Sequence, residues 1–496
     1  MSASPPGPSY IPVPDQDHDS NNPHVHDPSA ISDDNLERII QSEDEWQHDP
    51  VNPRNWSPAK KWRTTAIVTF YTFVISFASS TMARGLPEVA HEFYMMNPDV
   101  LKALFYHDSI FYLSFAIGPL FAAPLSEAYG RLKVLHWANL FFVVFNLDYT
   151  LLHNRSSPAS FVLRFLAGFV GSIPVTCGGA IVSDLFSERD RASPMAQYFV
   201  GHLIGPVVAH VMTGFINKPV VFDVLVGICS IVTPILGILM KESYAPIIRL
   251  RRDKNSLDPE KAATIHPAFT MNKWAYLWIN LKRPFMIITR SLICLILSLY
   301  MVLIYGIYYL MFTTSFPYRF FDLYHSRVLV SIGIGVGFLS ATIFGARICD
   351  KTYLRLAAKN RGKGKPEMRV PAVILGSLII SVGLLWYVWS ARAKMLFMAL
   401  VGAAIFAFGM MTALLAIQLY LVDTFTCAAS AIAATSILRS LLGFAFPFFG
   451  KQMFATVGYE RGDSLLVGLA IVIGILFPVW IYYAGERMRA RSSLTR

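Results

Sequence analysis

Three ionisable side chains occur inside long apolar stretches of the chain, where a charged group is costly. Arg164 and His210 lie in neighbouring stretches that are each long enough to cross a bilayer, and Arg439 lies near the middle of a later one. An ionised side chain at the bilayer centre costs about 2.5–3.5 kcal/mol or more, so it usually faces a polar cavity or a partner. We therefore take all three as candidate functional residues.

Each of the three has an alternative interpretation. Arg164 lies near the outer end of its stretch, so its guanidinium could instead reach the lipid headgroups. His210 titrates near neutral pH and is a candidate proton carrier or substrate contact, or else a substitution tolerated through a hydrogen bond to a neighbouring helix. Headgroups are out of easy reach for Arg439, which we expect to face a cavity or a buried acid.

The composition indicates a polytopic membrane protein of the all-α class. The chain of 496 residues is 54% hydrophobic and only 15% charged, whereas a soluble protein carries about 25% charged residues. The net charge of +11 is spread over short loops and not over one continuous face, which argues against nucleic acid as a partner. The five Cys residues show no CxxC spacing, so neither a disulfide framework nor a metal site is indicated.

Apolar runs of roughly 20 residues mark about twelve membrane-spanning helices. They are predicted at 64–84, 104–124, 134–152, 160–183, 194–215, 221–240, 288–311, 327–348, 371–390, 395–421, 429–450 and 464–484. A long polar stretch divides them into two halves of about six. The predicted parts are a disordered cytoplasmic tail 1–49, an N-terminal half 50–240, a cytoplasmic linker 241–287, a C-terminal half 288–485 and a cytoplasmic tail 486–496.

Lys and Arg concentrate in alternate loops, which predicts that both termini lie on the cytoplasmic side. Asn154 begins an Asn-X-Ser sequon in a loop that this topology places outside, so it is a candidate glycosylation site. Asp108 and Asp148 lie toward the same side and are candidate proton-carrying acids, with no ground for choosing between them.

Aromatic and polar residues in the C-terminal half form a candidate substrate cavity. Its predicted members are Tyr305, Tyr308 and Tyr309 in the seventh span, Gln418 in the tenth and Arg439 in the eleventh. Such a set suits a largely apolar organic molecule, although aromatic residues in spans more often serve packing or interfacial belts.

Several short motifs follow one another along the chain. After the second span the sequence reads G-P-L at 118–120 and A-P-L-S-E-A-Y-G-R at 123–131. Later it carries Arg164 with Gly168, then Gly201-x-x-x-Gly205-Pro206 with Gly214. These resemble the signature loop, the fourth-helix proton-coupling motif and the fifth-helix antiporter motif of the major facilitator superfamily. The chain departs from the pattern at Leu132, Ala209, His210 and Thr213.

The C-terminal half is similar to fungal drug:proton antiporters of that superfamily, through P-E-M-R-V-P at 366–371, Y-L-V-D-T-F at 420–425, R-S at 439–440 and F-P-F-F at 446–449. The resemblance implies the major facilitator fold, with two pseudo-symmetric halves. It also implies proton coupling at Arg164, where His210 is a second candidate. The implied cytoplasmic gate is Glu127, Gly130, Arg131 and Asp184, and the implied sliding helix contact is Gly201, Gly205, Pro206 and Gly214.

We therefore expect a monomeric, proton-coupled secondary transporter in the plasma membrane that exports a drug, toxin or secondary metabolite by alternating access. The expected partners are the small organic substrate, protons and the lipid bilayer, with no cofactor and no enzymatic activity. The alternatives are a proton symporter for uptake and a non-transporting membrane sensor with the same fold. The vacuolar membrane is the alternative location.

Overall fold

The computed structural model describes residues 46–92, 98–151, 158–215, 219–253, 273–311, 328–425 and 428–490, and almost all of them are helical. Asn154 lies outside the described residues, as do the side chains of Asp108 and Asp148. Among the described residues, eight helices are long and apolar enough to cross a membrane.

Six long helices make up the first half of the chain. They are α2 (Pro58–Glu92), α3 (Pro98–Tyr129), α4 (Arg131–Leu151), α5 (Pro158–Leu185), α6 (Ala192–Phe215) and α7 (Pro219–Gly237). A short turn of helix, η1 (Pro53–Asn55), precedes them. These helices match the first six predicted spans to within a few residues at most ends, because each span is an uninterrupted apolar run.

The second half consists of α11 (Leu292–Tyr309), α13 (Val328–Ser340), α14 (Ala346–Lys359), α15 (Val370–Arg392), α16 (Leu396–Thr424), α17 (Ala428–Val457) and α18 (Tyr459–Ala490). A π-helical turn, η4 (Ala341–Gly345), joins α13 to α14, so these three segments form one long rod across the eighth predicted span. A 3-10 turn, η5 (Pro366–Arg369), leads into α15.

The predicted linker contains helical segments. Helix α8 (Ala245–Asp253) follows α7, and α10 (Lys273–Arg290) precedes α11, with an extended backbone at Ser291 between α10 and α11. Helix α10 is amphipathic: Trp278, Ile279 and Phe285 are exposed, and Lys282 lies over the Trp278 ring at 5.0 Å. Such a face suits a membrane surface.

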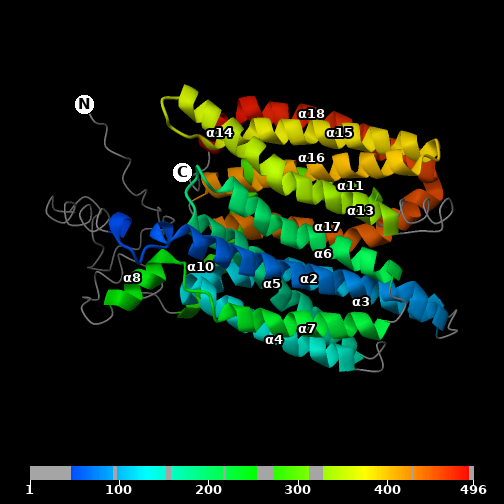
Figure 1. The fold of residues 1–496 in the computed structure, drawn as a ribbon, viewed down its shortest axis with the longest axis horizontal. Helices are drawn as coiled ribbons and strands as arrows, with labels where there is room; N and C mark the ends of the chain where they lie inside the picture. The colour runs from blue at the N-terminus through cyan, green and yellow to red at the C-terminus, as the bar shows by residue number, and fades with distance from the viewer. Residues whose placement is uncertain are drawn as a thin grey trace, which may run out of the picture.

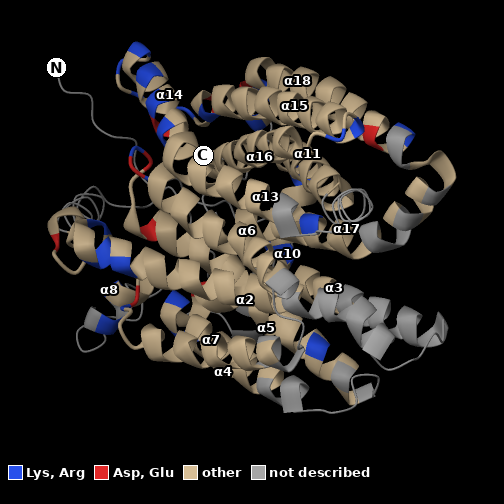
Figure 2. Cartoon of the chain, turned by 45° about the vertical axis from the view of Figure 1, so that its right-hand side comes forward, with Lys and Arg blue, Asp and Glu red and all other residues tan. Residues whose placement is uncertain are grey.

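The long helices run side by side in one bundle, with α2–α7 on one side and α15, α16 and α18 on the other (Figure 1). Across the boundary between the two halves, α6 packs against α13, and α3 packs against α17. Helices α8 and α14 project from one end of the bundle, where Lys and Arg gather (Figure 2). We call this end the basic end; the α3–α4, α5–α6 and α14–α15 turns lie there.

Glycine allows a close helix contact in the second half, between α15 and α16. A Cβ atom at Gly409 would lie 2.6 Å from the backbone nitrogen of Ile380, and one at Gly376 would lie 2.7 Å from that of Ala413. Apolar side chains gain little by leaving lipid for protein, because lipid tails are equally apolar. Membrane helices therefore associate through the van der Waals packing that such close approach allows.

The substitution Gly409→Val tests this contact, with Gly468→Val as its control. A side chain at Gly409 would overlap backbone, whereas nothing lies within 4 Å of a Cβ at Gly468 on α18. We expect Gly409→Val to cost about 1–3 kcal/mol or more of stability through overpacking. The measurement is the thermal unfolding midpoint of the purified chain in detergent, and equal midpoints for both variants would contradict the packing argument.

Candidate functional site

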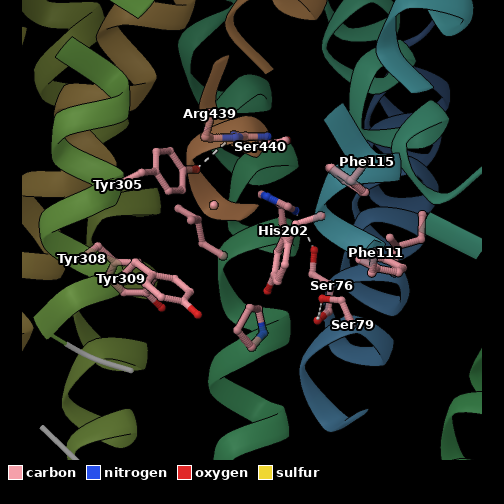
Figure 3. A pocket seen from close by; sticks show the side chains of 15 residues that line it. Ser76, Ser79, Phe111, Phe115, His202, Tyr305, Tyr308, Tyr309, Arg439 and Ser440 are labelled. Atoms are coloured by element: carbon pink, nitrogen blue, oxygen red, sulfur yellow. Dashed lines mark hydrogen bonds between the residues drawn. The ribbon is translucent and has the colours of Figure 1, made fainter. Parts of the chain in front are cut away.

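A cavity lies between the two halves of the bundle, lined by five helices (Figure 3). The first half contributes Ile75, Ser76 and Ser79 from α2, Phe111, Tyr112 and Phe115 from α3, and His202, Leu203 and Pro206 from α6. The second half contributes Tyr305, Tyr308 and Tyr309 from α11, and Arg439, Ser440 and Gly443 from α17. A cavity shared in this way changes shape whenever the halves move relative to each other.

Four of the five predicted cavity residues meet in this cavity: the three tyrosines of α11 and Arg439. The Arg439 side chain is only 7% exposed. Its Nη1 donates a hydrogen bond of 3.1 Å to the Tyr305 hydroxyl, and its guanidinium carbon lies 4.9 Å from the centre of the Tyr305 ring. Tyr305 therefore holds the guanidinium at the cavity wall.

Gln418 does not line the cavity. Its amide nitrogen lies 3.5 Å from the Met301 sulfur and 3.4 Å from the Thr435 hydroxyl, and the side chain is 1% exposed. It therefore packs α16 against α11 and α17. The sequence placed this residue in an apolar span but did not show which face of the helix it occupies.

His202 is a cavity residue that sequence reasoning missed. Its Nδ1 lies 2.6 Å from the Ser76 hydroxyl of α2, and its ring stacks on Phe115 of α3 with centroids 6.3 Å apart. The available signal was its position next to Gly201, one helical turn before Pro206 on the same face. His210, the predicted functional histidine, is half-buried, and its Nδ1 contacts the Pro206 carbonyl oxygen of its own helix.

Arg164 lies inside the bundle, behind the cavity wall. It is 1% exposed, its Nη2 donates to the Ser79 carbonyl oxygen at 3.1 Å, and its guanidinium lies 4.4 Å from the centre of the Phe111 ring. Both of these partners line the cavity. Arg164 therefore supports two cavity helices and does not reach outward to the headgroups.

The glycines of the fifth-helix motif bring α6 against α2. A Cβ at Gly205 would lie 2.7 Å from both the Phe77 nitrogen and the Ser76 Cβ, and one at Gly201 would lie 2.8 Å from the Thr72 hydroxyl. Pro206 lies on the cavity wall. Gly214 lies in the last turn of α6, and its surroundings are outside the described structure.

The predicted gate residues lie together at the basic end of the first half. The Arg131 side chain donates from Nε to Asp184 at 3.3 Å and from Nη1 to the Ser126 hydroxyl at 2.6 Å. Gly130 has a φ of 97°, and a Cβ there would lie 3.0 Å from the Glu242 carboxyl carbon. Glycine is therefore required at this turn on grounds of both conformation and space.

Glu242 and Arg283 complete this group, and neither was singled out from the sequence. The Glu242 carboxylate accepts from the backbone nitrogens of Arg131 at 3.0 Å and Leu132 at 3.2 Å, so it caps the first turn of α4. Arg283 of α10 pairs with Glu127 at 3.6 Å. The four predicted gate residues thus bind within the first half and to the linker helix.

A second ion-pair cluster joins the two halves. The Asp423 carboxylate at the end of α16 accepts from Arg191 of the first half at 2.6 Å and from Arg369 of the second half at 3.2 Å. Arg369 also donates to the Glu188 carbonyl oxygen at 2.6 Å. We call Arg191, Asp423 and Arg369 the inter-half cluster. It lies at the basic end, roughly 16 Å along α6 from His202, given a rise of 1.5 Å per residue.

Two six-helix halves with a cavity shared between them are the architecture of secondary transporters. The sequence profile of the Major Facilitator Superfamily matches residues 64–447. The chain belongs to the Major Facilitator Superfamily and is a multi-pass membrane transporter.

Similar proteins come from fungi. Efflux pump radE of Floropilus chiversii is 35% identical over 460 residues, covering 89% of this chain and 83% of the relative. MFS-type transporter hepF of Aspergillus oryzae is 36% identical over 469 residues, covering 90% of this chain and 94% of the relative. The proton:xylose symporter XylE aligns over 86% of this chain and 96% of its own with a TM-score of 0.65, and at 14% identity it shows the fold alone.

The inter-half cluster is testable by removing the charge that both arginines share. The substitution Asp423→Asn removes the carboxylate that the buried Arg191 and Arg369 share, and leaves Arg369 with only the more distant Asp350, at 3.9 Å. We expect a cost of about 3–5 kcal/mol. We expect amide hydrogen exchange in the 186–191 turn to become at least tenfold faster, since this cost exceeds 1.4 kcal/mol.

The matched control is Glu486→Gln at the same end. Glu486 pairs with Lys365 at 2.7 Å, but these side chains are 61% and 45% exposed, so the pair contributes about 0–1 kcal/mol. Exchange in the 186–191 turn should stay as in the unaltered chain. Equal exchange in both variants would show that Asp423 does not hold the halves together.

Proposed function

We propose that the protein is a proton-driven exporter of small organic compounds that works by alternating access. The observation that carries the proposal is the cavity itself. It takes residues from both halves, and the inter-half cluster joins the halves at the basic end, beyond the cavity. A cavity in this position opens to one side at a time when the two halves rock about it.

The basic end is the cytoplasmic end in this proposal, because cytoplasmic loops of membrane proteins are rich in Lys and Arg. Both termini then lie in the cytoplasm, and we assign the protein to the plasma membrane. With the inter-half cluster formed, the cytoplasmic side is closed and the cavity belongs to the outward-facing state.

Export is favoured over uptake by two observations. Gly201 and Gly205 of α6, which belong to the motif that resembles the antiporter motif, lie in close contact with α2. Two relatives carry the name efflux pump: radE of Floropilus chiversii and vrtL of Penicillium aethiopicum. The substrates of such an exporter would be drugs, toxins or secondary metabolites.

Proton coupling is assigned to the region of Arg164. Its guanidinium touches Ser79 and Phe111, which line the cavity, so a change in its electrostatic surroundings alters the position of two cavity helices. A nearby cation favours the ionised form of a carboxylic acid. If Arg164 moves when the two halves rock, the proton affinity of an acid beside it changes, and Asp108 and Asp148 are the candidate acids.

The test is accumulation of a panel of fluorescent aromatic compounds in cells that express the intact chain or Arg164→Ala, with and without a protonophore. We expect the intact chain to lower accumulation, and the mutation or the protonophore to reduce export at least tenfold, since removing a buried charge costs several kcal/mol. The control is Arg355→Ala, which removes an exposed arginine of α14.

Other outcomes separate the competing functions. A rise in accumulation that depends on the proton gradient would reverse the direction to uptake. No change for any compound, with the protein abundant at the membrane, would count against a carrier. Export that survives Arg164→Ala would remove this arginine from the coupling.

A further inference from the structure

Arg439 has no carboxylate partner among the described residues, although it is nine-tenths buried. Its hydrogen bond of 3.1 Å and its ring contact of 4.9 Å both go to Tyr305, which supplies no carboxylate. The buried arginines of the inter-half cluster differ, because Arg191 and Arg369 each reach the Asp423 carboxylate. Arg439 thus places a positive charge at the cavity, and the part of the chain that the structure describes supplies no negative charge to balance it.

The other lining residues that the structure describes do not supply that negative charge. The set contains hydroxyls, the His202 imidazole and aromatic rings, but no Asp or Glu. A buried cation without a counter-charge is unfavourable, so an anion that enters this space gains more than a neutral molecule of the same shape. A cationic ligand meets repulsion from Arg439 and finds no opposite charge among these residues.

The aromatic residues that line the cavity indicate what kind of ligand body it would bind. Phe111 and Phe115 form a stacked pair on one side, with centroids 5.8 Å apart, and Tyr308 and Tyr309 lie on another (Figure 3). Aromatic walls of this kind bind flat apolar bodies by stacking and by burial of surface. The polar end of such a ligand would lie toward Arg439.

We propose that the cavity selects aromatic organic acids in their ionised form, and that Arg439 binds the anionic group. This inference rests on the proposed function and names its substrate class. Tyr305 acts as a positioning residue that holds the guanidinium, and His202, fixed by Ser76 and Phe115, presents its ring to the same cavity.

The arrangement also joins ligand binding to the movement of the halves. Arg439 belongs to α17 of the second half, and His202 belongs to α6 of the first. An anion held by Arg439 with its aromatic body against Phe111 and Phe115 contacts both halves at once. Binding therefore favours the state in which these surfaces face each other across the cavity.

The experiment measures binding to the purified full chain in detergent by fluorescence anisotropy. The probes are three pyrene derivatives of similar size: 1-pyrenebutyrate, 1-pyrenebutanol and 1-pyrenebutylamine. We expect the carboxylate to bind at least tenfold more tightly than the alcohol, and the ammonium to bind most weakly, because only the carboxylate forms a charge-assisted bond with Arg439.

Variants assign this preference to Arg439. In Arg439→Gln the ratio of carboxylate to alcohol affinity should fall to about one, and Arg439→Lys should keep part of it because the charge remains. Unchanged binding of the alcohol shows that the cavity of each variant is intact. Arg355→Gln is the control, since it removes one exposed positive charge of α14 and should leave the ratio unchanged.

Equal or tighter binding of the alcohol or the ammonium by the intact chain would overturn the proposal. So would a carboxylate preference that survives Arg439→Gln. Because binding in detergent needs no proton gradient, this result is independent of export. A carboxylate preference without export in cells would reject the proposed function and keep the anion site, and the reverse result would reject the anion site alone.

Discussion

The Asp423 carboxylate joins the two halves of this transporter at the basic end. It ends α16 and binds Arg191 and Arg369, which belong to different halves of the bundle. A buried ion pair gains in Coulomb attraction about what it loses in hydration, so its net contribution is small while both partners are present. In the alternating-access cycle that we propose, this balance would make closure of the basic end both specific in geometry and reversible.

An arginine at the start of one helix pairs with an aspartate at the end of the following helix twice in the chain, once in each half. Arg131 begins α4 and reaches Asp184 at the end of α5, and Arg369 precedes α15 and reaches Asp423 at the end of α16. The first pair is satisfied within its own half. In the second pair, Asp423 also accepts a hydrogen bond from Arg191 of the other half. The two pairs therefore occupy equivalent positions, but only the second connects the halves.

Buried arginines serve different purposes in the two regions. At the basic end each of them meets a carboxylate: Arg131 that of Asp184, and Arg191 and Arg369 that of Asp423. Behind the cavity, Arg164 contacts a carbonyl oxygen and an aromatic ring of two lining residues. On the cavity wall, Arg439 has its hydrogen bond and its ring contact with Tyr305 and no carboxylate partner among the described residues. An unbalanced charge in that place is unfavourable for stability and becomes useful only when a ligand supplies the counter-charge.

The sequence alone determined the spans, their division into halves and the residues of the α3–α4 turn. The length of an apolar run, the charge of a loop and the need for glycine at a turn are local properties of the sequence. Tertiary structure decided the partners. Arg191 and Asp423 are 232 residues apart, and no local pattern pairs them. The rotation of α6 placed His202, and not His210, in the cavity, and the rotation of α16 turned Gln418 away from it. In a helix that is apolar on all sides, periodicity does not identify the inner face; only packing against the other helices does.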